Sequence, residues 1–219
     1  MPGAARGERR WAPDHHRRDR AARPALLQES WDPDLDLDAG VLRNRLGITD
    51  SEALRRAESG ISTVRIAQLA TESLPGDYDL AHLQAFHRLI FGDVYAWAGE
   101  LRTVSIGKGA LFCPPQRLVS RADQVFSTLA RLDRLRGRTR SAFVDGLTGL
   151  LAEINYLHPF REGNGRTQRA FLGQLARAAG HPIRWTAMDP AANVAASRAA
   201  HLDGDTGPLR ALLDSIVAR

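Results

Sequence analysis

One stretch constrains the possible fold more than any other: residues 158–169, which read HPFREGNGRTQR. Apolar residues at helical spacing precede and follow it, which predicts a buried helix on each side. Pro159 ends the first helix, because the residue before a proline is disfavoured in the right-handed helical region. The segment is therefore predicted to be a tight loop at the N-terminus of a second helix.

Such a loop is suited to binding an anion. The first backbone N–H groups of a helix have no partner within it, and the helix dipole favours negative charge there. The glycines of the turn Gly163-Asn164-Gly165 allow the backbone to close on a phosphate. Arg166 and Arg169 are three positions apart, so both are expected to reach a polyphosphate.

Two more side chains complete the candidate site. Glu162 offers hard oxygen ligands suited to Mg²⁺ shared with a phosphate. His158 is a candidate general base, because an imidazole titrates near neutral pH. A histidine at a helix end and a Gly-Asn-Gly turn are each commonly structural. Their combination within twelve residues indicates a functional site.

This segment resembles the signature of Fic-domain proteins, H-x-F-x-[D/E]-G-N-G-R-x-x-R, at every fixed position. The resemblance implies transfer of AMP from ATP to a hydroxyl side chain of a target protein. It implies His158 as the base and Glu162 as the Mg²⁺ ligand. It also implies an anion-binding loop, two phosphate-binding arginines and an apolar loop anchor: Gly163, Asn164, Gly165, Arg166, Arg169 and Phe160.

A second stretch, YAWAGELR at 95–102, resembles the segment that precedes a hairpin in Fic domains. Residues 102–113 have the pattern of a short β-hairpin with Gly107-Lys108-Gly109 at its turn. In the resembling family this hairpin is a flap whose edge receives the backbone of the target. The predicted docking residues are Ser105, Ile106, Gly107, Lys108 and Gly109. Lys108, the only lysine of the chain, is either a contact residue or an ordinary surface lysine.

The rest of the chain predicts helices near 52–70, 118–132, 189–199 and 206–217, and one that follows a cap at Asp77 or Asp79. The expected fold is mostly α-helical, with a single Fic-type helical domain at 29–219 and one β-hairpin flap.

Residues 1–28 are predicted to be a basic, disordered tail. Seven arginines against three acidic residues give positions 1–23 a net charge of +4, out of +5 for the chain. A nucleic-acid partner is therefore not expected for the folded part. The single cysteine, Cys113, excludes an intrachain disulfide and fits the cytoplasm. No apolar run is long enough to span a membrane.

Fic enzymes are commonly silenced by a helix with the pattern [S/T]-x-x-x-E-[G/N], whose glutamate pairs with the second signature arginine, here Arg169. None of the eight glutamates of the chain fits that pattern. We therefore expect a toxin that is inhibited in trans by a small antitoxin-like protein contacting Arg169. The resemblance offers a type II topoisomerase subunit as one candidate target.

Two alternatives stay open. A relative called Doc transfers the γ-phosphate of ATP instead, but its loop lacks the Gly-Asn-Gly present here. A non-catalytic module that binds a nucleotide or a nucleic acid is the other alternative, although it has no reason to keep His158 and Glu162.

Overall fold

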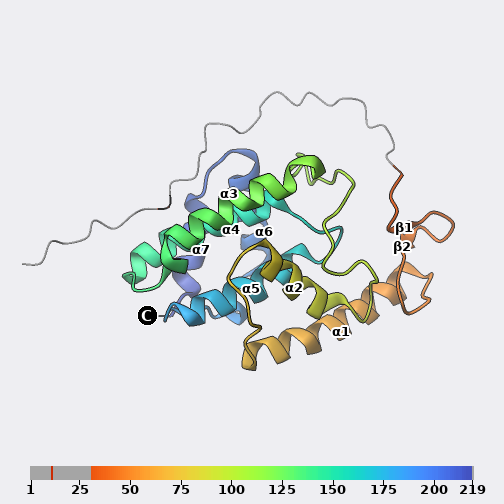
Figure 1. Ribbon diagram of the computed structural model, residues 1–219, viewed down its shortest axis with the longest axis horizontal. Helices are drawn as coiled ribbons and strands as arrows, with labels where there is room; N and C mark the ends of the chain where they lie inside the picture. The colour runs from red at the N-terminus through yellow and green to blue at the C-terminus, as the bar shows by residue number, and fades with distance from the viewer. Residues whose placement is uncertain (1–10, 12–30, 219) are drawn as a thin grey trace, which may run out of the picture.

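The computed structural model describes Trp11 and residues 31–218, and this part of the chain is mostly helical (Figure 1). Its helices are α1 (Ser51–Thr71), α2 (Leu80–Phe91), α3 (Leu118–Arg131), α4 (Arg140–Leu157), α5 (Asn164–Ala178), α6 (Pro190–Leu202) and α7 (Gly207–Ile216). Short 3₁₀ turns lie at Pro115–Arg117, Asp133–Leu135 and Trp185–Ala187. The strands β1 (Leu35–Asp36) and β2 (Val41–Leu42) form one antiparallel pair, with Leu35 opposite Leu42. The predicted helical fold is confirmed.

Helix α4 is the centre of the core. It is apolar on most of its surface, and a helix of that kind is stable only when it is surrounded by protein. Accordingly α3, α5, α6 and α7 all pack against it, while α1 and α2 lie beyond α5 (Figure 1). Its C-terminal end, and the loop that follows, are therefore anchored on a rigid element.

Local sequence signals account for the helix ends. Asp50, Asp79 and Asp189 accept hydrogen bonds from backbone N–H groups in the first turns of α1, α2 and α6, as N-cap residues do. Asp79 was one of the two predicted caps. Before α7, Thr206 occupies the cap position without a side-chain bond.

The predicted hairpin at 102–113 forms only in part. The segment does fold back on itself, with one bridge between Gly107 and Leu111 and a 3.1 Å bond from the N–H of Phe112 to the carbonyl of Ile106. All twelve residues are described, and none of them lies in a strand. The carbonyls of Val104 and Cys113, which could pair across a hairpin, instead accept from the side chain of Arg102.

Nearly all of the predicted tail lies outside the described residues. Trp11, its one described residue, packs against the core beside Gly149, where a Cβ atom would meet the indole ring. Within the described part, every helix is too short or too polar to cross a membrane.

Candidate active site

A cavity of about 760 Å³ brings together most of the predicted site. Its lining includes six of the predicted signature residues and four of the predicted flap residues: His158, Glu162, Gly163, Asn164, Gly165, Arg169, Ile106, Gly107, Lys108 and Gly109. Ser105, Phe160 and Arg166 are not among the lining residues. Residues of α6 also line the cavity and include Asn193, Ser197 and Arg198, which sequence reasoning did not assign to the site.

His158 is held in one orientation. It follows α4 in the left-handed conformation (φ 41°), and its ring stacks on Phe112 at 3.8 Å between centroids. Nδ1 lies 3.3 Å from the carbonyl of Asn155. Because a carbonyl can only accept, Nδ1 carries the hydrogen and Nε2 is the unprotonated nitrogen. Burial lowers the pKa of His158 to about 4, and the charge of Lys108 acts in the same direction. The ring is therefore neutral at pH 7 and can accept a proton.

Arg102 fixes the backbone around this histidine. Its buried guanidinium donates to the carbonyls of His158 and Val104, each at 2.8 Å, and to that of Cys113. Burial lowers the pKa of Arg102 to about 10, so it remains charged at pH 7. The side chain of Arg102 thus links the backbone of His158 to both ends of the flap segment. The sequence offered one signal for it, its fixed place in the second family motif.

His87 connects the two family motifs in a similar way. Its Nδ1 accepts from the N–H of Gly99 at 2.8 Å, so Nε2 carries the hydrogen and donates to the carbonyl of Glu162 at 3.0 Å. The ring also stacks on Phe160 at 3.9 Å. Burial lowers the pKa of His87 to about 4. The neutral ring of His87 therefore helps to hold the signature loop in place through Glu162 and Phe160. The helical spacing of the sequence did not suggest this role.

These two histidines predict how stability depends on pH. Their folded-state pKa values, about 4, lie below the value of 6.5 expected in the unfolded chain. The unfolded state therefore binds protons first as the pH falls. We expect full stability above about pH 6.5 and a progressive loss between pH 6.5 and 4, on the order of 3 kcal/mol from the fully buried His87. Urea unfolding across this range measures the loss, and a flat profile would contradict these assignments.

Contacts within the signature loop fix its conformation. Phe160 is buried, as an anchor would be. The side chain of Asn164 makes two hydrogen bonds to the backbone of Phe160: Oδ1 accepts from the Phe160 N–H at 2.9 Å, and Nδ2 donates to the Phe160 carbonyl at 2.7 Å. Gly163 has φ 78°, and a Cβ there would lie 2.4 Å from the ring of Phe91. The side chain of Asn164 is therefore structural, and only its backbone remains available to an anion.

Three backbone N–H groups stay open at the start of α5. Those of Asn164, Gly165 and Arg166 make no hydrogen bond within the described part of the chain. Gly165 is exposed and lines the cavity. Open donors at a helix N-terminus are an anion-binding arrangement, so the backbone geometry agrees with the predicted phosphate site.

The two signature arginines have different surroundings. Arg169 lines the cavity, has no acidic partner among the described residues, and has a pKa lowered by burial and by the charge of Arg166. Arg166 instead donates to the carboxylate of Glu58 and, at 3.1 Å, to Ser62 of α1. A buried carboxylate of α1 thus holds the guanidinium of Arg166, and contact of Arg166 with a polyphosphate stays a prediction.

Glu162 is placed to hold a cation. Its side chain is 48% exposed and lines the cavity, and Oε1 accepts from the N–H of Gly163 at 2.8 Å. The described residues contain no group of three or more acidic, histidine or cysteine side chains that could hold a metal ion alone. Mg²⁺ at nucleotide sites needs one or two carboxylates, with substrate phosphates completing its shell. A single glutamate beside an anion-binding loop fits that requirement.

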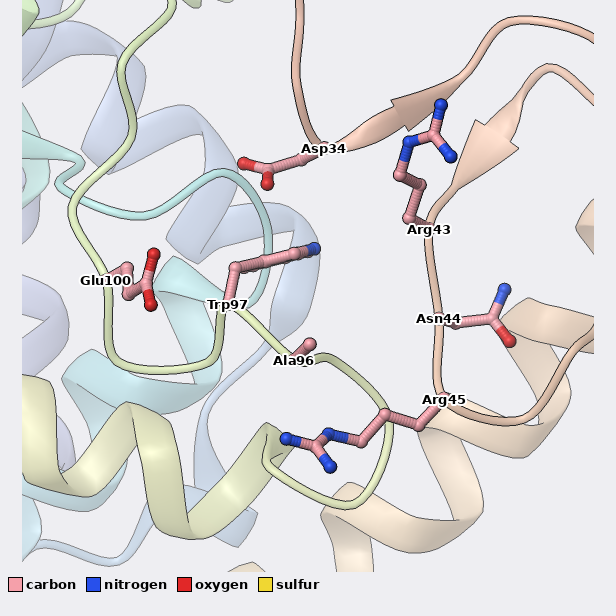
Figure 2. Close-up of a pocket in the computed structure, with 7 residues that line it drawn as sticks. All are labelled: Asp34, Arg43, Asn44, Arg45, Ala96, Trp97 and Glu100. Carbon is pink, nitrogen blue, oxygen red and sulfur yellow. The ribbon is translucent and has the colours of Figure 1, made fainter.

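A second cavity of about 520 Å³ lies beside β2 and contains none of the predicted site residues (Figure 2). The Trp97 ring extends into it, with the carboxylates of Asp34 and Glu100 and the exposed Arg45 around it (Figure 2). The neighbouring Asp32 bonds to Arg161 of the signature loop at 2.7 Å. Asp32, which lies just before β1, therefore supports the signature loop at Arg161.

Comparison with known proteins agrees with this geometry. A model of the Fic/DOC family matches residues 77–176. Protein adenylyltransferase VbhT of Bartonella schoenbuchensis is 44% identical over 155 residues, which are 70% of this chain and 32% of VbhT. The chain thus spans about a third of that relative.

A shorter relative is covered more completely. Probable protein adenylyltransferase y4lH of Sinorhizobium fredii is 45% identical over 153 residues, 68% of this chain and 78% of the relative. Among solved structures, BepC of Bartonella tribocorum with bound AMPPNP has the same fold, with a TM-score of 0.79 at 24% identity over 84% of this chain and 96% of the solved BepC chain. The chain therefore belongs to the Fic/DOC family.

Proposed function

We propose that this chain is a protein adenylyltransferase, which moves AMP from ATP to a Tyr, Thr or Ser hydroxyl of a target protein. The observation that carries the proposal is the state of His158: its Nε2 is unprotonated, and the residue lines the same cavity as Glu162 and as Asn164 and Gly165, whose N–H groups are open. The names of the two curated relatives support it.

In this proposal the reaction is one in-line displacement. The target hydroxyl oxygen forms a bond to the α-phosphorus, the bond from that phosphorus to the bridging oxygen breaks, and pyrophosphate leaves. His158 accepts the hydroxyl proton at Nε2. The open N–H groups of the loop and the guanidinium of Arg169 stabilise the phosphate charge. Glu162 would hold Mg²⁺, which when bound neutralises charge on the phosphates.

The experiment is incubation of the chain with a cell lysate and labelled ATP, followed by mass spectrometry of the modified proteins. The proposal requires AMP on a hydroxyl side chain, and substitution of Glu162 by glutamine should remove it. A phosphate in place of AMP would instead indicate the Doc-like reaction, and no modification at all would indicate a non-catalytic module.

The flap segment is proposed to dock the target backbone. Ile106 lies on the cavity wall, and its carbonyl is already used by Phe112. An Ile106→Pro substitution removes the N–H and restricts φ at this edge, so target modification should be lost while ATP binding persists. Modification at the wild-type rate, measured on a purified target, would show that docking occurs elsewhere.

We also propose that a small antitoxin-like protein inhibits the chain in the cytoplasm by pairing a glutamate with Arg169. The cavity-lining Arg169 has no acidic partner among the described residues, and such an arginine is a ready partner for a carboxylate. Expression of the chain with and without a small protein encoded beside it tests this. Harmless high-level expression of the active chain alone would refute the toxin role.

A further inference from the structure

Helix α1 contributes a buried carboxylate to the rear of the signature loop. Glu58 is only 8% exposed, and it accepts from the hydroxyl of Tyr95 and from the guanidinium of Arg166. A carboxylate is buried at acceptable cost only when charged or hydrogen-bonding partners compensate it. Glu58 has both kinds of partner, and one of them belongs to the signature.

Arg166 lies between two carboxylates and is bonded mainly to one. Besides Glu58, it contacts Ser62 at 3.1 Å, and its Cζ lies 4.7 Å from the centre of the Phe91 ring. Its Nη2 is 3.5 Å from Oε1 of Glu162, at the outer limit of a hydrogen bond. The guanidinium is thus held on the α1 side, although the carboxylate of Glu162 is within reach.

We propose that Glu58 is a positioning residue. It holds the guanidinium of Arg166 so that Arg166 does not bond to the carboxylate of Glu162, which can then ligate the divalent cation of the nucleotide complex. This inference rests on the proposed function, which assigns Glu162 to the metal. A guanidinium prefers a two-point bond to a carboxylate. Without the charge of Glu58, Arg166 would turn to Glu162, the other carboxylate in its contact range.

Two effects then weaken the cation site together. A carboxylate that is bonded to an arginine has fewer lone pairs left for a metal ion. The positive charge of Arg166, which Glu58 neutralises in the folded chain, would also repel the incoming cation. Outer partners of metal ligands commonly contribute 10- to 100-fold to metal affinity, so a loss of about tenfold is expected.

The experiment measures Mn²⁺ binding to the full chain in the presence of AMPPNP, with free Mn²⁺ determined by electron paramagnetic resonance. Glu58→Gln should weaken Mn²⁺ binding about tenfold. Adding Arg166→Gln to that variant should restore affinity to within about twofold of wild type, because the competing guanidinium is gone. A purely structural role of Glu58 predicts the opposite, an equal or greater loss in the double variant.

Matched variants keep the result interpretable. Glu52→Gln changes an exposed glutamate of the same helix and should leave Mn²⁺ affinity unchanged. If Glu58→Gln does not fold, Glu58→Asp keeps the charge at shorter reach, and it should show a smaller loss that Arg166→Gln again reverses.

Glu162→Gln separates the two possible failures. If it leaves Mn²⁺ affinity intact, the proposed function loses its metal ligand. If Glu162→Gln weakens binding while Glu58→Gln changes it less than twofold, the inference about Glu58 is overturned alone.

Discussion

Replacing His158 with alanine should lower the rate of AMP transfer by about two to four orders of magnitude, the range expected when a general base is removed. The reason is the single available nitrogen: Nδ1 faces the Asn155 carbonyl, which leaves Nε2 to accept the hydroxyl proton. The low pKa of His158, about 4 through burial, keeps the ring neutral at pH 7. The measurement is the initial rate of target labelling at saturating ATP.

Two controls accompany this result. Nucleotide affinity should stay near the wild-type value, because the open N–H groups, Glu162 and Arg169 are unchanged. His158→Asn retains a polar side chain but cannot act as a base at neutral pH, so it should be as slow as the alanine variant. Transfer at the wild-type rate in either variant would remove His158 from the reaction.

Replacing Arg102 with methionine should have the largest effect on stability, a loss of about 3 kcal/mol in the free energy of unfolding. The guanidinium serves the carbonyls of His158, Val104 and Cys113, and a buried acceptor left without its donor costs about 1–3 kcal/mol. Transfer activity should fall as well, since the same bonds hold the base and the flap segment in place. Urea unfolding and labelling rates measure the two effects.

The matched control is Arg65→Met on α1. Arg65 bonds to Asp93 at the surface, and exposed ion pairs contribute about 0–1 kcal/mol. Arg102→Lys preserves the charge but lacks the planar fork that reaches several carbonyls, so it should fall between wild type and Arg102→Met. Equal stability of Arg102→Met and Arg65→Met would contradict the positioning role.

Features encoded locally could be predicted from the sequence. The apolar repeat of α4, Pro159 after it and Asp79 before α2 place helix ends within a few residues of those in the structure. The site itself is compact in sequence, so His158, Glu162 and Arg169 line one cavity as expected. In a short loop between two helices, side chains that are close in sequence are also close in space, so they reach the same cavity.

Features that depend on distant partners could not be predicted. Glu58 lies 108 residues before Arg166, and no local pattern shows that the two side chains bond. The same holds for His87 with Glu162 and for the α6 wall of the cavity. The flap lacks the expected strands because Arg102 takes carbonyls that a ladder would use, and β1 and β2 are too short to produce an alternating pattern.

The most direct test of the central claim is a pair of labelling reactions with purified chain and target, one with ATP labelled at the α-phosphate and one with ATP labelled at the γ-phosphate. Transfer of AMP predicts that the target is labelled only from the α-position, and that His158→Ala abolishes the label. A target labelled from the γ-position, or labelled equally by wild type and His158→Ala, would contradict the account.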